Sequence, residues 1–147
     1  MRGERCENTL EVSGERREIK YEKYMDNSDF YYRKLTVYHK AMQLVANIYQ
    51  LTSLFPQEEK YGLANQIQRA VVSIPSNIAE GMGRFSNKER THFLEIANGS
   101  LMEVMCQCEV ALLLGYISQQ QFDEQEIFIN DTAKMLIGLR KHFENLV

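Results

Sequence analysis

The sequence predicts an all-α protein, an up-down-up-down four-helix bundle preceded by a polar N-terminal tail. Glycine and proline are scarce, with 8 and 2 among 147 residues, whereas Leu, Ala, Glu, Gln, Lys and Met are common. Apolar residues recur at three- and four-residue steps in four segments, which short turns connect. Four amphipathic helices with short connections pack most simply as an antiparallel bundle. We therefore expect a tail over residues 1–30 and one bundle domain over residues 31–147.

The tail contains few apolar residues and mixes charges without a clean face, as in "GERREIKYEKY". Such a segment is expected to be disordered or weakly helical. Met25 begins the stretch "MDNSDFYY", which would make a natural start of the protein. We therefore hypothesise that translation begins at Met25, and the intact mass of the natively expressed protein tests this.

The first two helices are expected over residues 35–55 and 62–80. Pro56 ends the first, and Gly81 and Gly83 end the second, as C-terminal glycines commonly do. The apolar stripe of the first helix contains Leu35, Tyr38, Met42, Val45, Ile48, Tyr49 and Thr52. The stripe of the second contains Leu63, Ile67, Ala70, Val71, Ile74 and Ile78.

The third and fourth helices are expected over residues 87–114 and 119–145, each after a capping box. Ser86 pairs with Glu89 in the first box, and Ser118 pairs with Gln121 in the second. The stripe of the third helix contains Phe93, Ala97, Ser100, Leu101, Val104, Cys108, Ala111 and Leu112. The stripe of the fourth contains Ile129, Ala133, Leu136, Leu139, Phe143 and Leu146. "MLIGL", residues 135–139, is apolar nearly all round, which suggests a second face buried by a partner subunit.

Pro75 interrupts the second helix, where it removes a backbone hydrogen bond to Val71 and costs roughly 3 kcal/mol. A polar stripe runs past it, opposite the isoleucines, and contains Gln66, Arg69, Ser73, Asn77, Glu80 and Arg84. Two interpretations remain open. The stripe is a solvated face with a kink at Pro75 that fits the curvature of the bundle, or the kink and the stripe shape an interface to a subunit or a ligand.

Charge and reactive residues give no sign of catalysis. The net charge is −3, and neither residues 1–29 nor the remainder is basic, so nucleic acid would need a local patch. The three histidines fall in three different expected helices without ligand spacing. Cys106 and Cys108 are expected to be small buried or half-buried apolar residues. We expect no enzyme activity, no metal and no cofactor, and the lack of a signal sequence or membrane span favours the cytoplasm.

The segments "SIPSNIAEG", "GRFS", "FLEIANGSLMEV" and "LGYI" together resemble the four-helix bundle proteins of 23S rRNA intervening sequences. The resemblance runs over about residues 32–143 and implies a bacterial, left-handed bundle that assembles into a barrel-like homopentamer. A related branch comprises the accessory proteins of diversity-generating retroelements. That branch resembles a basic pentamer that binds nucleic acid and docks on a reverse transcriptase.

Two groups of residues are expected to be functional or structural in a protein of this kind. Four basic side chains are expected near the turn between the second and third helices, where they would contact phosphates: Arg69, Arg84, Lys88 and Arg90. A structural polar network or subunit interface is expected from Ser73, Asn77, Glu80, Ser100 and Glu103. Within it, the glutamate at 103 is expected to pair with Arg69 or Asn77.

Three functions are weighed. The first is a non-catalytic homo-oligomer, pentameric by resemblance, that binds structured RNA or RNA/DNA through the local basic cluster. The alternative is a protein–protein adaptor that docks on a larger enzyme such as a retroelement reverse transcriptase. The third, a bundle enzyme or metal protein, is disfavoured because the sequence lacks the corresponding motifs.

Overall fold

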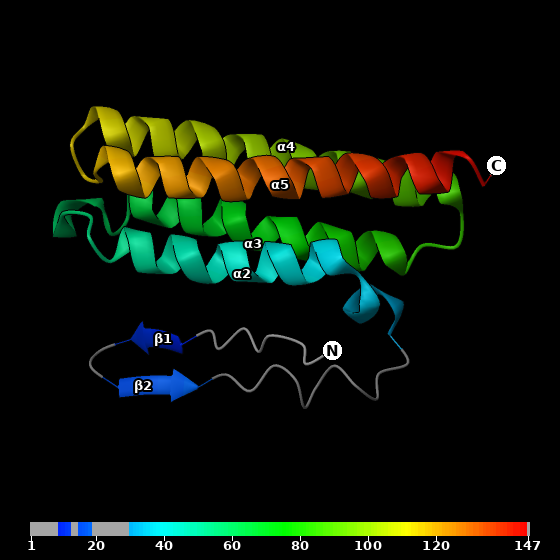
Figure 1. Ribbon diagram of the computed structural model, residues 1–147, viewed down its shortest axis with the longest axis horizontal. Coiled ribbons are helices and arrows are strands. Elements are labelled where there is room, and N and C mark those ends of the chain that lie inside the picture. The colour runs from blue at the N-terminus through cyan, green and yellow to red at the C-terminus, as the bar shows by residue number, and fades with distance from the viewer. Residues whose placement is uncertain (1–8, 13–14, 19–29, 147) are drawn as a thin grey trace, which may run out of the picture.

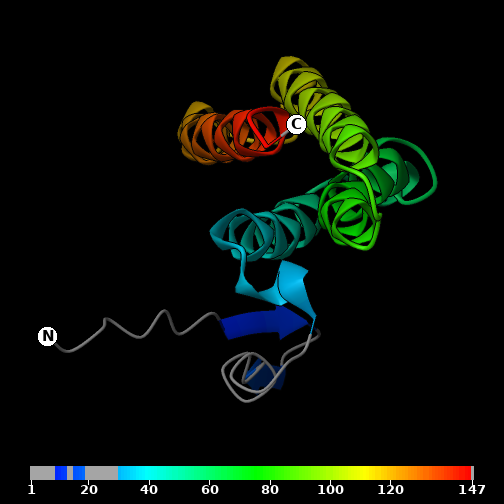
Figure 2. The same cartoon turned by 90° about the vertical axis from the view of Figure 1, so that its right-hand side faces the viewer.

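The computed structural model describes residues 9–12, 15–18 and 30–146. Four helices form its body: Thr36–Thr52 (α2), Leu63–Met82 (α3), Asn87–Leu113 (α4) and Gln119–Glu144 (α5) (Figure 1). Each helix contacts the next along the chain, and α5 returns to contact α2, so the four surround one core (Figure 2). The four-helix bundle that the sequence predicts is therefore confirmed.

Two short elements of the N-terminal segment differ from the expectation. Strands β1 (Thr9–Val12) and β2 (Glu15–Glu18) pair antiparallel, with Thr9 opposite Glu18 and Val12 opposite Glu15. A disordered or weakly helical tail was expected here, and the strand pairing corrects that expectation for these residues. The sequence signal was present but short: apolar and polar residues alternate in "TLEV", as is typical of a strand. Met25 lies outside the described residues.

One apolar stripe from each helix builds the core. The largest fully buried side chains are Leu44, Ile48, Ile67, Val71, Ile74, Ile78, Leu94, Leu101, Val104, Ile129, Thr132 and Leu136. On α3 every residue of the predicted stripe is buried or half-buried, which confirms that stripe. On α4 and α5 the predicted stripes also face the core, apart from the exposed Leu146 at the end of the chain.

The buried face of α2 is rotated from the one expected. Its buried side chains are Val37, Ala41, Leu44, Ile48, Leu51 and Thr52. Tyr38 is only half-buried and Tyr49 is 44% exposed. The helix carries two overlapping apolar stripes, and the one made of aliphatic side chains packs inward. The tyrosines flank the core because their hydroxyls favour contact with water.

The helix ends agree with the expected ones to within a few residues. α2 ends three residues early at Thr52, and α3 continues through Pro75 and Gly81 to Met82. At Ser118 both hydrogen bonds of the capping box form, one to the serine hydroxyl and one to the Gln121 side chain. At Ser86 the structure shows one of the two, in which the hydroxyl accepts from the Glu89 amide. Along α3, the bend expected at Pro75 stays a prediction.

α3 and α4 approach each other closely at Gly81. A Cβ built there would lie 2.7 Å from the Cβ of Phe93, whereas one at Gly138 of α5 meets nothing within 4 Å. We therefore expect Gly81→Ala to lower the free energy of unfolding by about 1–3 kcal/mol through overpacking. The control Gly138→Ala is expected to raise it by roughly 0.5–1 kcal/mol. Urea unfolding followed by circular dichroism measures both, and equal effects would contradict the close approach.

Candidate nucleic-acid interface

The bundle is polarised in charge along its axis. α2 and α4 begin, and α3 and α5 end, at the end that carries the α3–α4 turn (Figure 1). The half nearest that turn comprises residues 30–43, 73–100 and 132–146 and holds nine Lys and Arg against four Glu. The other half, residues 44–72 and 101–131, holds two basic and eight acidic residues. We call these the basic half and the acidic half.

The predicted basic cluster is only partly brought together. Arg84, Lys88 and Arg90 lie at or just after the α3–α4 turn, in the basic half. Arg69 lies thirteen positions before Met82, the last residue of α3, which corresponds to about 20 Å of helix. It is exposed in the acidic half. The structure therefore does not bring Arg69 to the turn with the other three basic residues, because helical spacing places it on the same face but not at the same end.

Two arginines of the turn are held over aromatic rings. The Arg84 guanidinium lies 4.6 Å from the centroid of the Phe93 ring, and its Nη2 is 3.1 Å from Glu80 Oε1. The Arg90 guanidinium lies 5.5 Å from the centroid of the Phe143 ring. The contact of Arg90 joins the start of α4 to the end of α5. Stacked guanidinium groups are positioned in advance for planar, bidentate contacts with phosphate.

Lysines at this end are available for an anionic partner. Lys34, Lys88 and Lys141 are exposed, and none forms an ion pair with another of the residues that the structure describes. They come from the 3-10 turn Tyr31–Lys34 (η1), the first turn of α4 and the last turn of α5. Three elements far apart in sequence thus each contribute at least one such charge to the basic half.

Exposed aromatic side chains accompany these charges, and the sequence reasoning missed them. Phe85 is 102% exposed at the tip of the α3–α4 turn, between Arg84 and the N-cap residue Ser86. Tyr31 of η1 is also exposed. At the level of sequence the "GRFS" segment contributed only to the family resemblance, although aromatic side chains that accompany positive charge are a common feature of surfaces that bind single strands.

The expected polar network takes a different form. The Asn77 Nδ2 donates to the backbone oxygen of Ser73 at 2.7 Å, and the Ser73 hydroxyl donates to the backbone oxygen of Ala70 at 2.6 Å. Both bonds lie within α3. Ser100 of α4 is half-buried, and Glu80 is exposed and bound to Arg84.

Glu103 forms neither of the pairs expected for it. Its Oε1 accepts from Gln107 Nε2 at 3.3 Å, one turn along α4, whereas Arg69 and Asn77 belong to α3. The pairing of Glu103 with Arg69 or Asn77 is therefore corrected. The physical reason is that exposed carboxylates are satisfied by neighbours on their own helix or by water.

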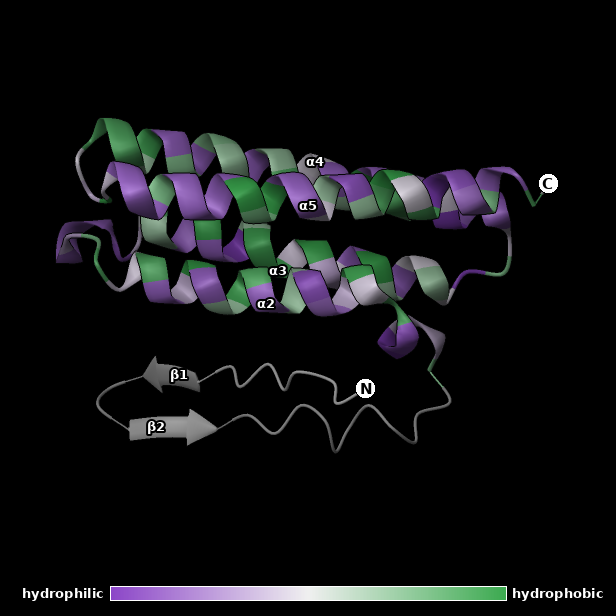
Figure 3. Cartoon of the chain, in the orientation of Figure 1, coloured by the Kyte–Doolittle hydropathy of each residue, from purple (hydrophilic) through white to green (hydrophobic). Residues whose placement is uncertain are grey.

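α4 is apolar on two faces. Besides its core stripe it exposes Ile96, Met102, Val110 and Leu113, at steps of three and four residues with the exposed Gly99 and Cys106 among them. We call these six residues the outer stripe of α4, and apolar segments recur along that helix (Figure 3). The second apolar face that the sequence predicts at residues 135–139 of α5 is smaller than the outer stripe of α4. Leu136 is in the core, and only Ile137 and Gly138 of this segment are exposed.

The two cysteines of α4 have opposite environments. Cys108 is buried, and burial raises the pKa of its thiol to about 12. Cys106 is exposed, which corrects the expectation that both are buried or half-buried. At pH 8 we expect iodoacetamide to alkylate Cys106 in the folded chain while Cys108 stays unmodified until urea unfolds the protein, because the thiolate is the reactive form. Peptide mass spectrometry measures both sites, and native alkylation of Cys108 would contradict its burial.

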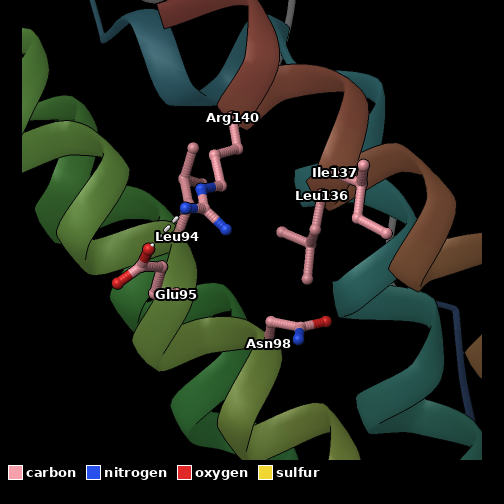
Figure 4. Close-up of a pocket in the computed structure, with 6 residues that line it drawn as sticks. All are labelled: Leu94, Glu95, Asn98, Leu136, Ile137 and Arg140. Atoms are coloured by element: carbon pink, nitrogen blue, oxygen red, sulfur yellow. Dashed lines mark ion pairs between the residues drawn. The ribbon is translucent and has the colours of Figure 1, made fainter. Parts of the chain in front are cut away.

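A small cavity lies between α4 and α5, lined by Leu94, Glu95, Asn98, Leu136, Ile137 and Arg140 (Figure 4). Arg140 closes its rim through an ion pair with Glu95 at 2.8 Å. Its volume of about 90 Å³ is far below the several hundred Å³ that organic ligands occupy.

Within the described part of the chain, no three His, Cys, Asp or Glu side chains gather as metal ligands would. Nor does any helix of that part combine the length and hydropathy needed to span a bilayer.

Comparisons with known proteins agree on the fold. A family model described as "23S rRNA-intervening sequence protein" matches residues 33–138. The chain is also similar to a crystal structure of a protein of unknown function, described as from the S23 ribosomal protein family of Bacteroides thetaiotaomicron VPI-5482. The two are 23% identical with a TM-score of 0.67, and the match covers 72% of this chain and 99% of that chain. A comparison with curated proteins gives no match.

Proposed function

This chain belongs to the 23S rRNA-intervening sequence protein family, and from that premise we propose that it is a non-catalytic, homo-oligomeric protein that binds nucleic acid in the cytoplasm. The observation that carries the proposal is the charge polarity of the bundle, with nine basic and four acidic residues in the half around the α3–α4 turn. The overall charge of −3 conceals this surface, because the two halves interleave along the sequence.

The chemistry of the basic half fits single-stranded or looped RNA. Lys34, Lys88 and Lys141 supply phosphate contacts, which provide affinity without reading sequence. Phe85 offers an open ring face on which an unpaired base can stack. A basic surface with a protruding aromatic ring favours a flexible strand over a rigid duplex, because the bases of a duplex are already stacked.

Assembly into a homopentamer is the second part of the proposal. The outer stripe of α4 supports it, since an apolar stripe on an otherwise polar surface is typical of an interface. Gly99 lies within the stripe, and a Cβ there would meet nothing within 4 Å in one subunit, so a neighbouring backbone has room to approach. In a closed ring the basic halves of all subunits face the same way, which strengthens the field that attracts RNA.

A single aromatic substitution tests the stacking contact. We expect Phe85→Ala to weaken binding of a labelled RNA hairpin with an unpaired loop by about 5- to 100-fold, the usual worth of one base–aromatic stack. Binding of a DNA duplex is expected to change little. Fluorescence anisotropy at 50 and 200 mM salt measures both. Tyr61→Ala is the matched control, since Tyr61 is 85% exposed but lies in the acidic half. Equal losses in the two variants would contradict a role for Phe85.

The outer stripe of α4 also favours a second candidate function, an adaptor that docks on a larger enzyme such as a reverse transcriptase. An affinity pull-down from the native host separates the two functions. Capture that RNase abolishes supports the nucleic-acid protein, whereas RNase-resistant capture of one protein that Met102→Glu abolishes supports the adaptor.

A further inference from the structure

A polar groove lies between α2 and α5, and all of its lining residues except Gln43 belong to the acidic half. Its volume is about 540 Å³, within the range of binding sites for organic ligands and short peptide segments. It is lined by Gln43, Asn47, Gln50, Leu51, Ser53, Leu54, Gln121, Glu124, Gln125 and Phe128. The lining is thus dominated by carboxamides and contains one charge, that of a glutamate.

One acceptor atom of this lining, the Oε1 of Gln125, lacks a hydrogen-bond partner. Gln125 is only 9% exposed, and its Oε1 accepts no hydrogen bond from the part of the chain that the structure describes. An unpaired buried acceptor destabilises the folded chain until a donor reaches it. Because Gln125 borders the groove, rotation of its amide presents this oxygen to a donor group lying there.

The charges around the groove define the ligand further. Glu124 is exposed and forms no ion pair among the described residues, and the acidic half holds eight acidic residues against two basic ones. The chain already places one cation beside the groove: Lys40 Nζ lies 3.9 Å from the centroid of the Phe128 ring and 3.9 Å from Asp131 Oδ2. The unpaired oxygen of Gln125 and the negative charge of Glu124 together favour a ligand that brings an N–H donor and positive charge.

The length of the groove indicates an extended peptide. On the α2 side its lining runs from Gln43 to Leu54, about 16 Å at the helical rise per residue. Five residues of extended chain span about the same distance. Carboxamides offer both donors and acceptors to a peptide backbone, and Leu54 offers an apolar contact to the stem of a lysine or arginine.

We propose that the α2–α5 groove binds an extended, basic peptide segment of a partner protein, with Gln125 accepting from it and Glu124 pairing with its lysine or arginine. This site is separate from the RNA surface, so the chain joins a nucleic acid at one end to a basic protein segment at the other.

The test uses the full chain and the fluorescein-labelled pentapeptide Ala-Lys-Ala-Arg-Ala, with Ala-Glu-Ala-Glu-Ala as the acidic counterpart, in anisotropy titrations. We expect the basic peptide alone to bind. Glu124→Lys is expected to raise its dissociation constant about tenfold or more, since it replaces attraction by repulsion. Glu126→Lys is the matched control, because this residue is not part of the lining and points away, about 200° around α5. It is expected to stay within about twofold of wild type.

Gln125→Leu removes the unpaired acceptor while conserving volume. We expect it to weaken peptide binding about fivefold while the melting temperature stays the same or rises, because a buried unsatisfied group is lost. No binding of the basic peptide at 1 mM, equal binding of the acidic one, or equal losses in Glu124→Lys and Glu126→Lys would overturn the proposal. Binding of spermidine without binding of the peptide would also overturn it, in favour of a free polyamine. RNA affinity, measured on the same variants, reports on the basic half separately, so failure of one site is distinguishable from failure of the other.

Discussion

Reversing the charges of Lys34, Lys88 and Lys141 to glutamate is expected to abolish RNA binding at physiological salt. Each side chain is exposed, and none is paired with another described residue, so each can displace a counterion from a phosphate. Losing three such contacts reduces the slope of log K against log salt by about 2 to 3. The reversed charges add repulsion, so we expect an affinity loss on the order of 100- to 1,000-fold.

The matched control for this experiment lies at the other end of the bundle. The double variant Lys60→Glu with Arg69→Glu reverses the charge of the two basic residues of the acidic half. We expect it to change RNA affinity by less than about threefold, because both residues lie more than a Debye length from the α3–α4 turn. Anisotropy titrations from 50 to 300 mM salt give both slopes. If the control lost as much affinity as the triple variant, overall charge and not the basic half would govern binding.

Placing charge in the outer stripe of α4 is expected to dissociate the oligomer. Met102 and Val110 are exposed in the subunit, so Met102→Glu with Val110→Glu leaves the bundle core unchanged. In a subunit interface each unpaired carboxylate would be buried, which costs several kcal/mol per site. We therefore expect the double variant to be a folded monomer in light scattering coupled to size exclusion, with the helical circular dichroism of the wild type.

Two further measurements make this test specific. Ile127→Glu is the control, since Ile127 is exposed on α5 outside the stripe, and it is expected to keep the wild-type mass. Cys106 lies within the stripe, so the alkylation by iodoacetamide that we expect in the folded wild type is expected to be faster still in the monomeric variant. A double variant with unchanged mass and unchanged Cys106 reactivity would exclude this stripe as the interface.

The local features of the helices follow from short-range sequence. The α3 stripe around Ile67 and Ile74 was predicted correctly because its apolar residues occupy a single face. The box at Ser118 and the cap at Ser86 depend only on residues three positions apart. The prediction was less accurate where one helix carries two apolar faces that compete for the core. α2 has two overlapping apolar stripes, and only packing against α3 and α5 decided that the tyrosines flank the core.

The candidate site depended more on tertiary structure. Arg84, Lys88 and Arg90 were identified from sequence because they are close together in the chain, whereas Lys34 and Lys141 join them only when the helices align antiparallel. Arg69 belongs to the same polar stripe as Arg84 but lies about 20 Å before the end of α3, a distance that a periodicity argument ignores. Phe85 was overlooked because exposure of a turn residue depends on what the rest of the fold leaves uncovered.

By itself the sequence determined the number, type and approximate ends of the four helices and the family to which the chain belongs. These depend on periodicity, capping and motifs, which act over one or a few turns. Only the tertiary structure decided which face of α2 is buried, that α4 keeps a second apolar face exposed, and that charge separates into a basic and an acidic half. These properties depend on residues far apart in the chain. An antiparallel bundle brings the start of one helix beside the end of the next, and a local pattern in the sequence does not contain that arrangement.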